Sequence, residues 1–118
     1  MINENEICEL IASILTGVTV GIGSLVLLFS SGASILIQCP FQCGKEGTSR
    51  MGHGEAVNDS VLFFSALNHE VKNAEMLSND TLILSLSGGY EIKIYPENNG
   101  LESYVVTTSH GGMPIINY

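Results

Sequence analysis

The side chains of this chain that could do chemistry are three cysteines and three histidines. Cys39 and Cys43 form a C-x3-C pair, His53 follows ten residues later, and Cys8 lies far upstream. Structural zinc sites need four Cys or His ligands, usually from two such pairs, and only one pair is present. We therefore expect no metal site, with Cys39 a small core residue and Cys43 in a loop. A disulfide between Cys39 and Cys43 is geometrically possible, although an odd number of cysteines is more typical of a protein in a reducing cytosol.

The histidines support one enzyme hypothesis. His53 and His110 each precede a glycine in a glycine-rich loop, and they are its candidate acid and base. His69 has Glu70 beside it, but adjacent residues of a strand point to opposite faces. The chain has no G-x-S-x-G or GxxxxGK[ST] motif, and its glycine pair at 21–24 lacks the third glycine of a dinucleotide loop. We therefore expect neither an enzyme nor a cofactor, and histidines in loops or on the surface.

The charged residues are few and unevenly placed. The 118 residues include twelve acids and four bases, for a formal net charge of −8. Residues 1–9 carry three Glu, residues 10–44 carry no charge, and residues 45–118 carry nine acids and four bases. A nucleic-acid binder needs a basic face, so this balance argues against a nucleic-acid partner. An acidic face can instead steer a basic protein partner, although solubility alone would also explain the charge.

The uncharged residues 10–44 could be mistaken for a membrane span. Between Thr16 and Ser34, however, ten of nineteen positions are Gly, Ser or Thr, and the longest apolar run is five residues. Such a run is typical of a buried strand, whereas a spanning helix needs about 20 apolar residues. The first six residues are acidic, unlike the basic start of a signal peptide. We therefore expect a cytoplasmic protein that has no membrane partner.

A fourteen-residue segment occurs twice, at an offset of 57. Residues 25–38, LVLLFSSGASILIQ, align with residues 82–95, LILSLSGGYEIKIY, and six positions are identical. Each copy is closely followed by a proline, Pro40 or Pro96. Self-similarity of this kind sets the architecture of a chain.

Each copy predicts a β-hairpin. In the second copy, apolar residues alternate with others on both sides of Gly88-Gly89, which supplies the tight turn. In the first copy the outward positions, Val26, Leu28 and Leu36, are apolar too. We therefore expect the first hairpin to be covered on both faces or to lie at the centre of a sheet.

The other elements follow from shorter patterns. Apolar residues at helical spacing predict a helix over residues 3–14 and a second over 59–68, with Asn58 or Asp59 as its N-cap. Four glycines among polar residues predict a loop over 42–56. The remaining strands are expected at residues 18–22, 71–77, 102–108 and 113–118.

These elements predict one α+β domain over residues 1–118 that is mainly β. Two repeat halves, at about residues 16–40 and 71–96, would curve into one small barrel or sandwich. A short helix would lie at the N-terminus and a second would connect the halves.

The pattern resembles a family of small bacterial two-repeat β proteins that includes immunity proteins of polymorphic and contact-dependent toxin systems. The resemblance rests on the opening Leu15-Thr16-Gly17-Val18, the two Pro-terminated hairpins, the Glu102-Ser103-Tyr104 strand and the final Gly-Gly strand. It covers residues 15–118 and implies a protein that binds a toxin. It implies no catalytic residues.

The predicted function is therefore an immunity protein that binds a cognate toxin domain, a basic nuclease, and occludes its active site. Carboxylates would pair with basic groups of the toxin, and aromatic side chains would fill its pockets. The alternative is a non-enzymatic structural or interaction domain. The predicted contact residues are the carboxylates and aromatics Asp59, Glu91, Glu97, Glu102, Tyr95 and Tyr104.

Overall fold

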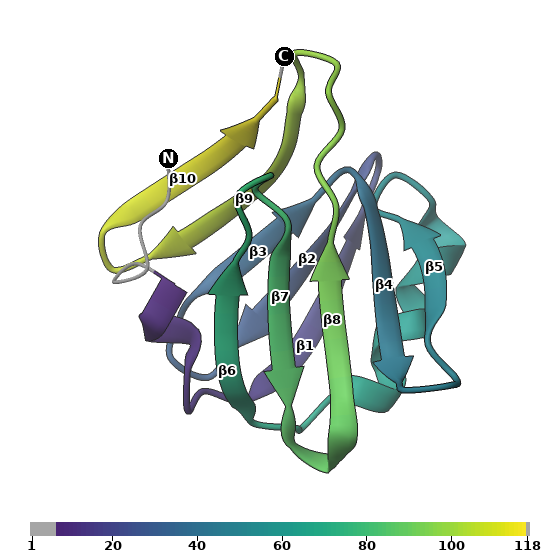
Figure 1. Ribbon diagram of the computed structural model, residues 1–118, viewed down its shortest axis with the longest axis vertical. Helices are drawn as coiled ribbons and strands as arrows, with labels where there is room; N and C mark the ends of the chain where they lie inside the picture. The colour runs from purple at the N-terminus through teal and green to yellow at the C-terminus, as the bar shows by residue number, and fades with distance from the viewer. Residues whose placement is uncertain (1–6, 118) are drawn as a thin grey trace.

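The computed structural model describes residues 7–117 as two antiparallel five-stranded sheets that face each other (Figure 1). Sheet 1 has the strand order β1-β2-β3-β9-β10, and sheet 2 has the order β5-β4-β8-β7-β6. The elements are η1 (Cys8–Leu10), β1 (Leu15–Gly21), β2 (Ser24–Phe29), β3 (Ser34–Ile37), β4 (Pro40–Lys45), β5 (Arg50–His53), η2 (Val57–Ala66), β6 (Val71–Met76), β7 (Leu82–Leu86), η3 (Ser87–Gly89), β8 (Tyr90–Ile94), β9 (Glu102–Thr108) and β10 (Gly111–Ile116).

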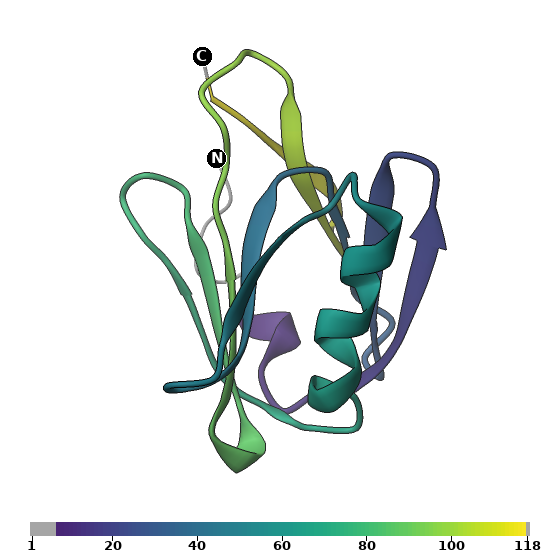
Figure 2. The ribbon, with the colours of Figure 1, turned by 90° about the vertical axis from the view of Figure 1, so that its right-hand side faces the viewer.

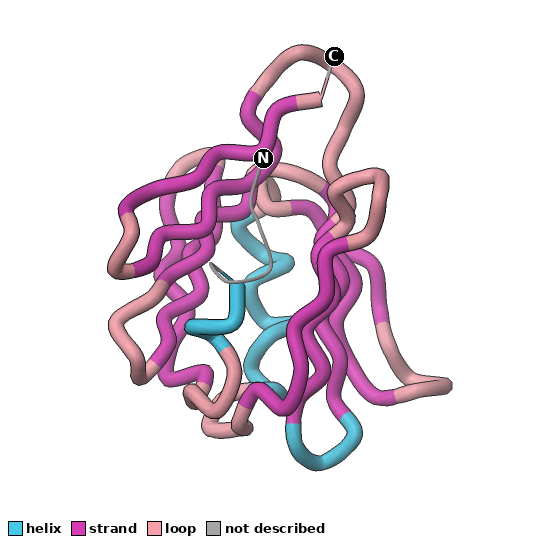
Figure 3. Tube along the Cα trace, turned by 60° about the vertical axis from the view of Figure 1, so that its left-hand side comes forward, coloured by secondary structure: helices cyan, strands magenta, loops and turns pink. Residues whose placement is uncertain are grey.

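One hydrophobic core fills the space between the sheets (Figure 3). Alternate residues of the central strands point into it, because side chains of a strand alternate between its faces. The 3-10 helix η2 lies along the open side of the two layers, where it contacts β1, β4 and β5 (Figure 2). Its buried Phe63 stacks on Phe41 of β4, with 4.3 Å between the ring centroids. The fully buried members of the two hairpins are Leu25, Leu27, Ile35, Ile37, Leu82, Leu84, Ile92 and Ile94.

The mainly-β prediction is confirmed, and the described strands form two open sheets rather than a closed barrel. Both repeat segments are hairpins, β2–β3 and β7–β8. The uncharged stretch forms β1, β2, β3 and most of β4. No helix in residues 7–117 combines the length and apolarity needed to cross a bilayer.

The two halves of the chain are related residue by residue. In the β2–β3 hairpin Leu25 pairs with Ile37, and in the β7–β8 hairpin Leu82 pairs with Ile94, an offset of 57 for both partners. The strand β1 matches β6 at an offset of 56, and both carry a bulge at the same place, at Leu15/Gly17 and at Val71/Asn73. The strands β4–β5 match β9–β10 at an offset of 63, with Phe41↔Gly52 corresponding to Tyr104↔Ile115.

This correspondence defines a pseudo-two-fold arrangement. Each half places three strands in one sheet and sends its last two strands to the other sheet. The equivalent residues Ile14 and Glu70, separated by the offset of 56, form a bridge with each other, so the local two-fold axis passes between them. The equivalent Ala12 and Asn68 both have a φ of 70°. The internal repeat therefore extends well beyond the fourteen residues visible in the sequence.

The predicted helix over residues 3–14 is wrong in its second half, and its residues 3–6 lie outside the described part. The chain forms only the short η1, and β1 begins at Leu15. Ala12 turns the chain with its positive φ and donates its N–H to the Val71 carbonyl at 2.8 Å. Pairing with the second half therefore overrides the local helical spacing.

The predicted loop over residues 42–56 is also wrong. It contains most of β4 and all of β5, and β4 pairs with β5 on one side and with β8 on the other. Cys43 accordingly lies in β4 with its side chain buried, not in a loop. The sequence does not predict these strands, because Gln, Gly and Met at their outward positions do not give a regular alternation of apolar and polar residues.

The second helix is present, but as η2 over Val57–Ala66, two residues earlier than predicted. Neither Asn58 nor Asp59 caps it, because the N-cap position is Ala56 and has no side-chain hydrogen bond. Asp59 instead accepts a hydrogen bond from the His53 backbone N–H at 2.9 Å. Among the other strands, 102–108 is confirmed as β9, and 71–77 matches β6 to within one residue.

Tyr104 is a core residue. Its side chain is fully buried, and its hydroxyl donates to the Asp80 carbonyl at 2.7 Å and lies 3.3 Å from the Met76 sulfur. Burial raises the pKa of its phenol far above its ordinary value. The residue is the counterpart of Phe41 in the other half, at the offset of 63.

We expect Tyr104→Phe to destabilise the fold by about 1–3 kcal/mol, because the Asp80 carbonyl would lose its donor. Urea unfolding followed by circular dichroism measures this free energy. Tyr95→Phe is the matched control, since the Tyr95 hydroxyl bonds to Gln42 at 2.9 Å on a partly exposed surface. Equal losses in both variants would contradict a special role for the Tyr104 hydroxyl.

Candidate functional site

Three carboxylates line one hollow at the end of the two layers, and we call this hollow the acidic loop site. Glu55 follows β5, whereas Glu97 and Glu102 flank the loop between β8 and β9. The hollow has a volume of about 380 Å³. Its other lining residues are Gln38, Asn99 and Leu101, and Leu101 is 67% exposed. The site therefore combines an acidic wall with an exposed apolar side chain.

Hydrogen bonds hold the loop that carries Glu97 and Glu102. The Glu97 backbone N–H donates to the hydroxyl of the buried Ser103 at 3.0 Å. The Leu101 N–H donates to the Asn99 side chain at 3.0 Å, and the Gly100 N–H donates to the Asn117 carbonyl at 2.7 Å. These bonds position the carboxylates before any partner arrives, which lowers the entropic cost of binding.

His53 lies between two of these acids. Its Nε2 is 3.5 Å from the Glu97 carboxylate, and its Nδ1 is 3.8 Å from the Glu55 carboxylate. The Glu55 backbone N–H donates to Nδ1 at 3.1 Å, so the proton of the neutral ring is on Nε2, facing Glu97. This contact orients the Glu97 side chain.

The bases of the chain lie elsewhere. Lys45 and Arg50 are at the opposite end of β4 and β5, since Pro40 pairs with His53 near the acidic loop site and Cys43 pairs with Arg50 near the turn. Lys72 is paired with Glu70 at 2.7 Å, and Lys93 with Glu91 at 3.4 Å. Among the described residues that line the acidic loop site, none is Lys or Arg. No lysine or arginine in this lining thus compensates the three carboxylates.

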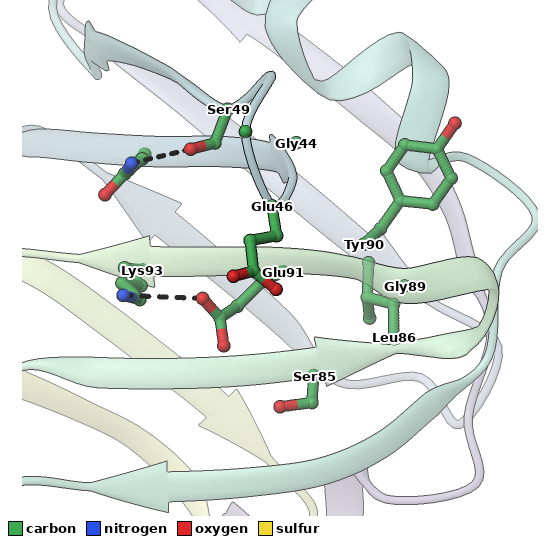
Figure 4. A pocket seen from close by; sticks show the side chains of 11 residues that line it. Gly44, Glu46, Ser49, Ser85, Leu86, Gly89, Tyr90, Glu91 and Lys93 are labelled. Carbon is green, nitrogen blue, oxygen red and sulfur yellow. Dashed lines mark hydrogen bonds and ion pairs between the residues drawn. The ribbon is translucent and has the colours of Figure 1, made fainter.

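A second hollow lies on the outer face of sheet 2 and has a volume of about 490 Å³. Glu46 and Glu91 both line it, and Lys93 is paired to Glu91 (Figure 4). Lys93 leaves this hollow with one net negative charge, against three in the acidic loop site. Because attraction for a cation grows with uncompensated charge, the acidic loop site is the stronger candidate.

The structure separates the residues that the sequence predicts as partner contacts. Glu97 and Glu102 share the acidic loop site, whereas Glu91 lines the sheet 2 hollow. Tyr95 is partly exposed and lies between Glu91 and Glu97 in the sequence. The Asp59 carboxylate already accepts a hydrogen bond from the His53 backbone N–H. Tyr104 cannot touch a partner, because it is fully buried.

Sequence reasoning missed Glu55 and Leu101. The sequence places Glu55 in the predicted loop over residues 42–56, and no local pattern indicates that this segment returns beside Glu97. Its contact with His53 follows only from the pairing of β5 with β4.

The three histidines lie apart from one another. His69 lies where the first half of the chain joins the second, and its Nδ1 is 3.1 Å from the Ser87 hydroxyl. His110 is exposed in the turn between β9 and β10. Within residues 7–117, no three His, Cys, Asp or Glu side chains are grouped as metal ligands.

The cysteines differ in exposure. All three are free thiols; Cys8 is exposed, whereas Cys39 and Cys43 are buried. Burial raises the pKa of both the Cys39 and the Cys43 thiol to about 12, and the Glu97 carboxylate adds to the effect at Cys39. The reactive thiolate is therefore suppressed at both buried positions.

We expect one thiol per chain to react with Ellman's reagent in the native protein at pH 8, and all three after denaturation. The reacting residue is Cys8, and Cys8→Ser should remove the native reaction. Rapid native labelling of Cys39 or Cys43 would contradict the buried placement of these side chains.

Comparison of the chain with protein-family models, with curated proteins and with solved structures finds no match. The class that the fold defines is a two-layered, mainly-β domain, and the function is argued below from the sites alone.

Proposed function

We propose that this protein is an immunity protein of a bacterial toxin system. It binds a cognate toxin domain that carries a basic active-site face, such as a nuclease, and occludes that face. The observation that carries the proposal is the acidic loop site, where Glu55, Glu97 and Glu102 from two loops surround one open hollow with no lining base.

The chemistry of the site fits a lysine or arginine of a protein partner. An arginine guanidinium can bridge two carboxylates, and its aliphatic stem can pack on an exposed apolar side chain such as Leu101. Nuclease active sites gather basic residues because they bind phosphates, and such a surface would be drawn to a chain of net charge −8. The resemblance noted in the sequence points in the same direction, and the site of action would be the cytoplasm.

Co-expression with the adjacent upstream gene tests this proposal. The product of that gene should stop growth when induced alone, and this chain should restore growth and elute with it as one complex. A harmless upstream product, or a toxic one that this chain neither binds nor neutralises, would contradict the proposal.

A non-enzymatic interaction domain without a toxin is the second candidate. The observation that favours it is the uncharged outer face of sheet 1, which carries exposed apolar side chains. A toxin bound through carboxylates would not need this face.

A further inference from the structure

The outer face of sheet 1 is uncharged over two rows of paired residues, and half of these residues are apolar. Cross-strand pairing aligns one outward residue from each strand in a row, and a second row follows beside it. We call these ten positions the sheet 1 exterior. They are Thr19, Val26, Leu36, Val105 and Pro114 in the central row, and Gly17, Leu28, Ser34, Thr107 and Gly112 in the neighbouring row.

The fold does not require this composition, and the pseudo-two-fold relation provides the comparison. The positions of sheet 2 equivalent to the central row have the same pairing and outward direction, yet two of them are charged. They are Glu75, Ile83, Lys93, Gln42 and Met51. Because one backbone arrangement carries charged residues in one sheet and none in the other, the fold alone does not account for the uncharged exterior of sheet 1.

No described element covers the sheet 1 exterior. The helical segments η1 and η2 lie at the space between the sheets (Figure 3). Leu28 is 39% exposed, Pro114 is exposed, and Val26, Leu36 and Val105 are half-buried only by their neighbours in the sheet. Apolar side chains gathered on one uncovered sheet face are a feature of interaction surfaces.

We propose that two copies of this chain associate through the sheet 1 exterior to form a symmetric dimer. The face is self-complementary, which a two-fold interface requires. Leu36 lies on β3, the middle strand of the sheet, and a valine flanks it on each side, Val26 and Val105. A two-fold axis that passes Leu36 in the interface plane and runs parallel to the strands places Val26 of one copy against Val105 of the other.

The uncharged face fits a second copy better than a strongly charged partner. The ten positions carry no charge, so two chains of net charge −8 can meet there without facing carboxylates. The same absence gives a basic partner nothing to bind on this face, and the acidic net charge opposes an anionic lipid surface. In each copy of the dimer, the acidic loop site and the outer face of sheet 2 would stay exposed.

The area sets the expected strength. Five strands about 4.8 Å apart and about five residues long give a plan area of roughly 400 Å² per copy. Two copies reach about 800 Å² before side-chain relief is counted, which is below the roughly 1,200 Å² of stable interfaces and within the range of weak, transient ones. We therefore expect a reversible dimer with a dissociation constant in the micromolar range.

Sedimentation equilibrium on the full chain between about 5 and 500 μM tests the dimer, because a weak interface populates it only in this range. Val26→Lys should weaken association at least about 30-fold, since the dimer would bury two unpaired charges. Ile83→Lys is the matched control, as it makes the same charge change at the equivalent position of sheet 2 and should leave association unchanged. Melting temperatures of both variants show that each is folded.

Three results would overturn the proposal. The wild-type chain could remain monomeric over the whole concentration range. Ile83→Lys could weaken association as much as Val26→Lys. The chain could bind neutral phosphatidylcholine vesicles in a way that Val26→Lys abolishes, which would make this face a membrane surface.

A cross-link tests the position of the axis. With Cys8→Ser present, Leu36→Cys should give a disulfide-linked dimer on mild oxidation, because two copies of residue 36 meet at the axis. Lys93→Cys in the same background, at the equivalent position of sheet 2, should not. Efficient cross-linking through residue 93 and not through residue 36 would place the interface on the other sheet.

Discussion

Gly54→Ala is expected to destabilise this protein more than any other single methyl addition at its described glycines. A Cβ at residue 54 would lie 2.1 Å from the Ile37 carbonyl oxygen, 2.4 Å from the Ile37 carbonyl carbon and 2.8 Å from the Gln38 nitrogen. All three atoms belong to the backbone, so no rotamer change can relieve the contact. The residue lies where the chain after β5 passes the end of β3, and its N–H donates to the Cys39 carbonyl at 2.9 Å.

We expect a loss of about 3 kcal/mol or more, at the upper end for overpacking, because two backbone segments must separate. This loss corresponds to a fall in melting temperature of about 10 °C or more. Thermal unfolding followed by circular dichroism measures the shift. Gly112→Ala is the control, since its added Cβ has no neighbour closer than 3.6 Å. Similar melting temperatures for the two variants would show that the two segments are not packed in this way.

The second large effect concerns the partner. Replacing Glu55, Glu97 and Glu102 together by lysine should weaken binding of a basic toxin domain by at least 100-fold, or about 2.7 kcal/mol. The change turns three attractive charges into three repulsive ones in a site whose lining includes no base. The free energy of unfolding should fall little, because Glu55 and Glu102 are exposed and pairs of this kind contribute about 0–1 kcal/mol.

The matched control reverses three acids away from the acidic loop site. Glu46, Glu75 and Glu91 replaced by lysine give the same change in net charge, so a general electrostatic effect would weaken binding equally in both triple variants. Isothermal titration calorimetry at low and high salt measures both affinities. Equal losses would show that binding depends on net charge and not on the acidic loop site, and a larger loss in the control variant would place the binding surface on the outer face of sheet 2.

The sequence predicts the two central hairpins well because their alternation has a period of two over a long stretch. It predicts β9 to the residue, since the Glu102–Thr108 run is β-branched and aromatic. The error at residues 11–14 arises because Ile7, Leu10, Ile11 and Ile14 have helical spacing by coincidence. Ile7 and Leu10 do reach the core, but the chain reverses at Ala12 to pair with the second half.

The candidate site is predictable only in part. Glu97 and Glu102 follow from their loop, because both flank a turn rich in Asn and Gly. The role of Glu55 depends on contacts between distant parts of the chain, and no local pattern reports them. Tyr104 is predicted from the sequence as a contact residue for a partner. Its side chain points into the core instead and is fully buried.

The full extent of the repeat also needs the structure. Residues 25–38 and 82–95 retain sequence identity because both hairpins supply the same core positions. The flanking strands have diverged, and only their registers and the shared bulge reveal the correspondence. The comparison of equivalent positions matters for function, because a residue type found in only one of the two sheets is not a requirement of the fold that they share.

The most direct test of the proposed function is a titration of the toxin domain encoded upstream with this protein, following the catalytic activity of the toxin. We predict a linear fall to complete inhibition at one chain per toxin domain. The variant with lysine at residues 55, 97 and 102 should fail to inhibit at that ratio. Full toxin activity at saturating wild-type protein, or equal inhibition by this variant, would contradict the account.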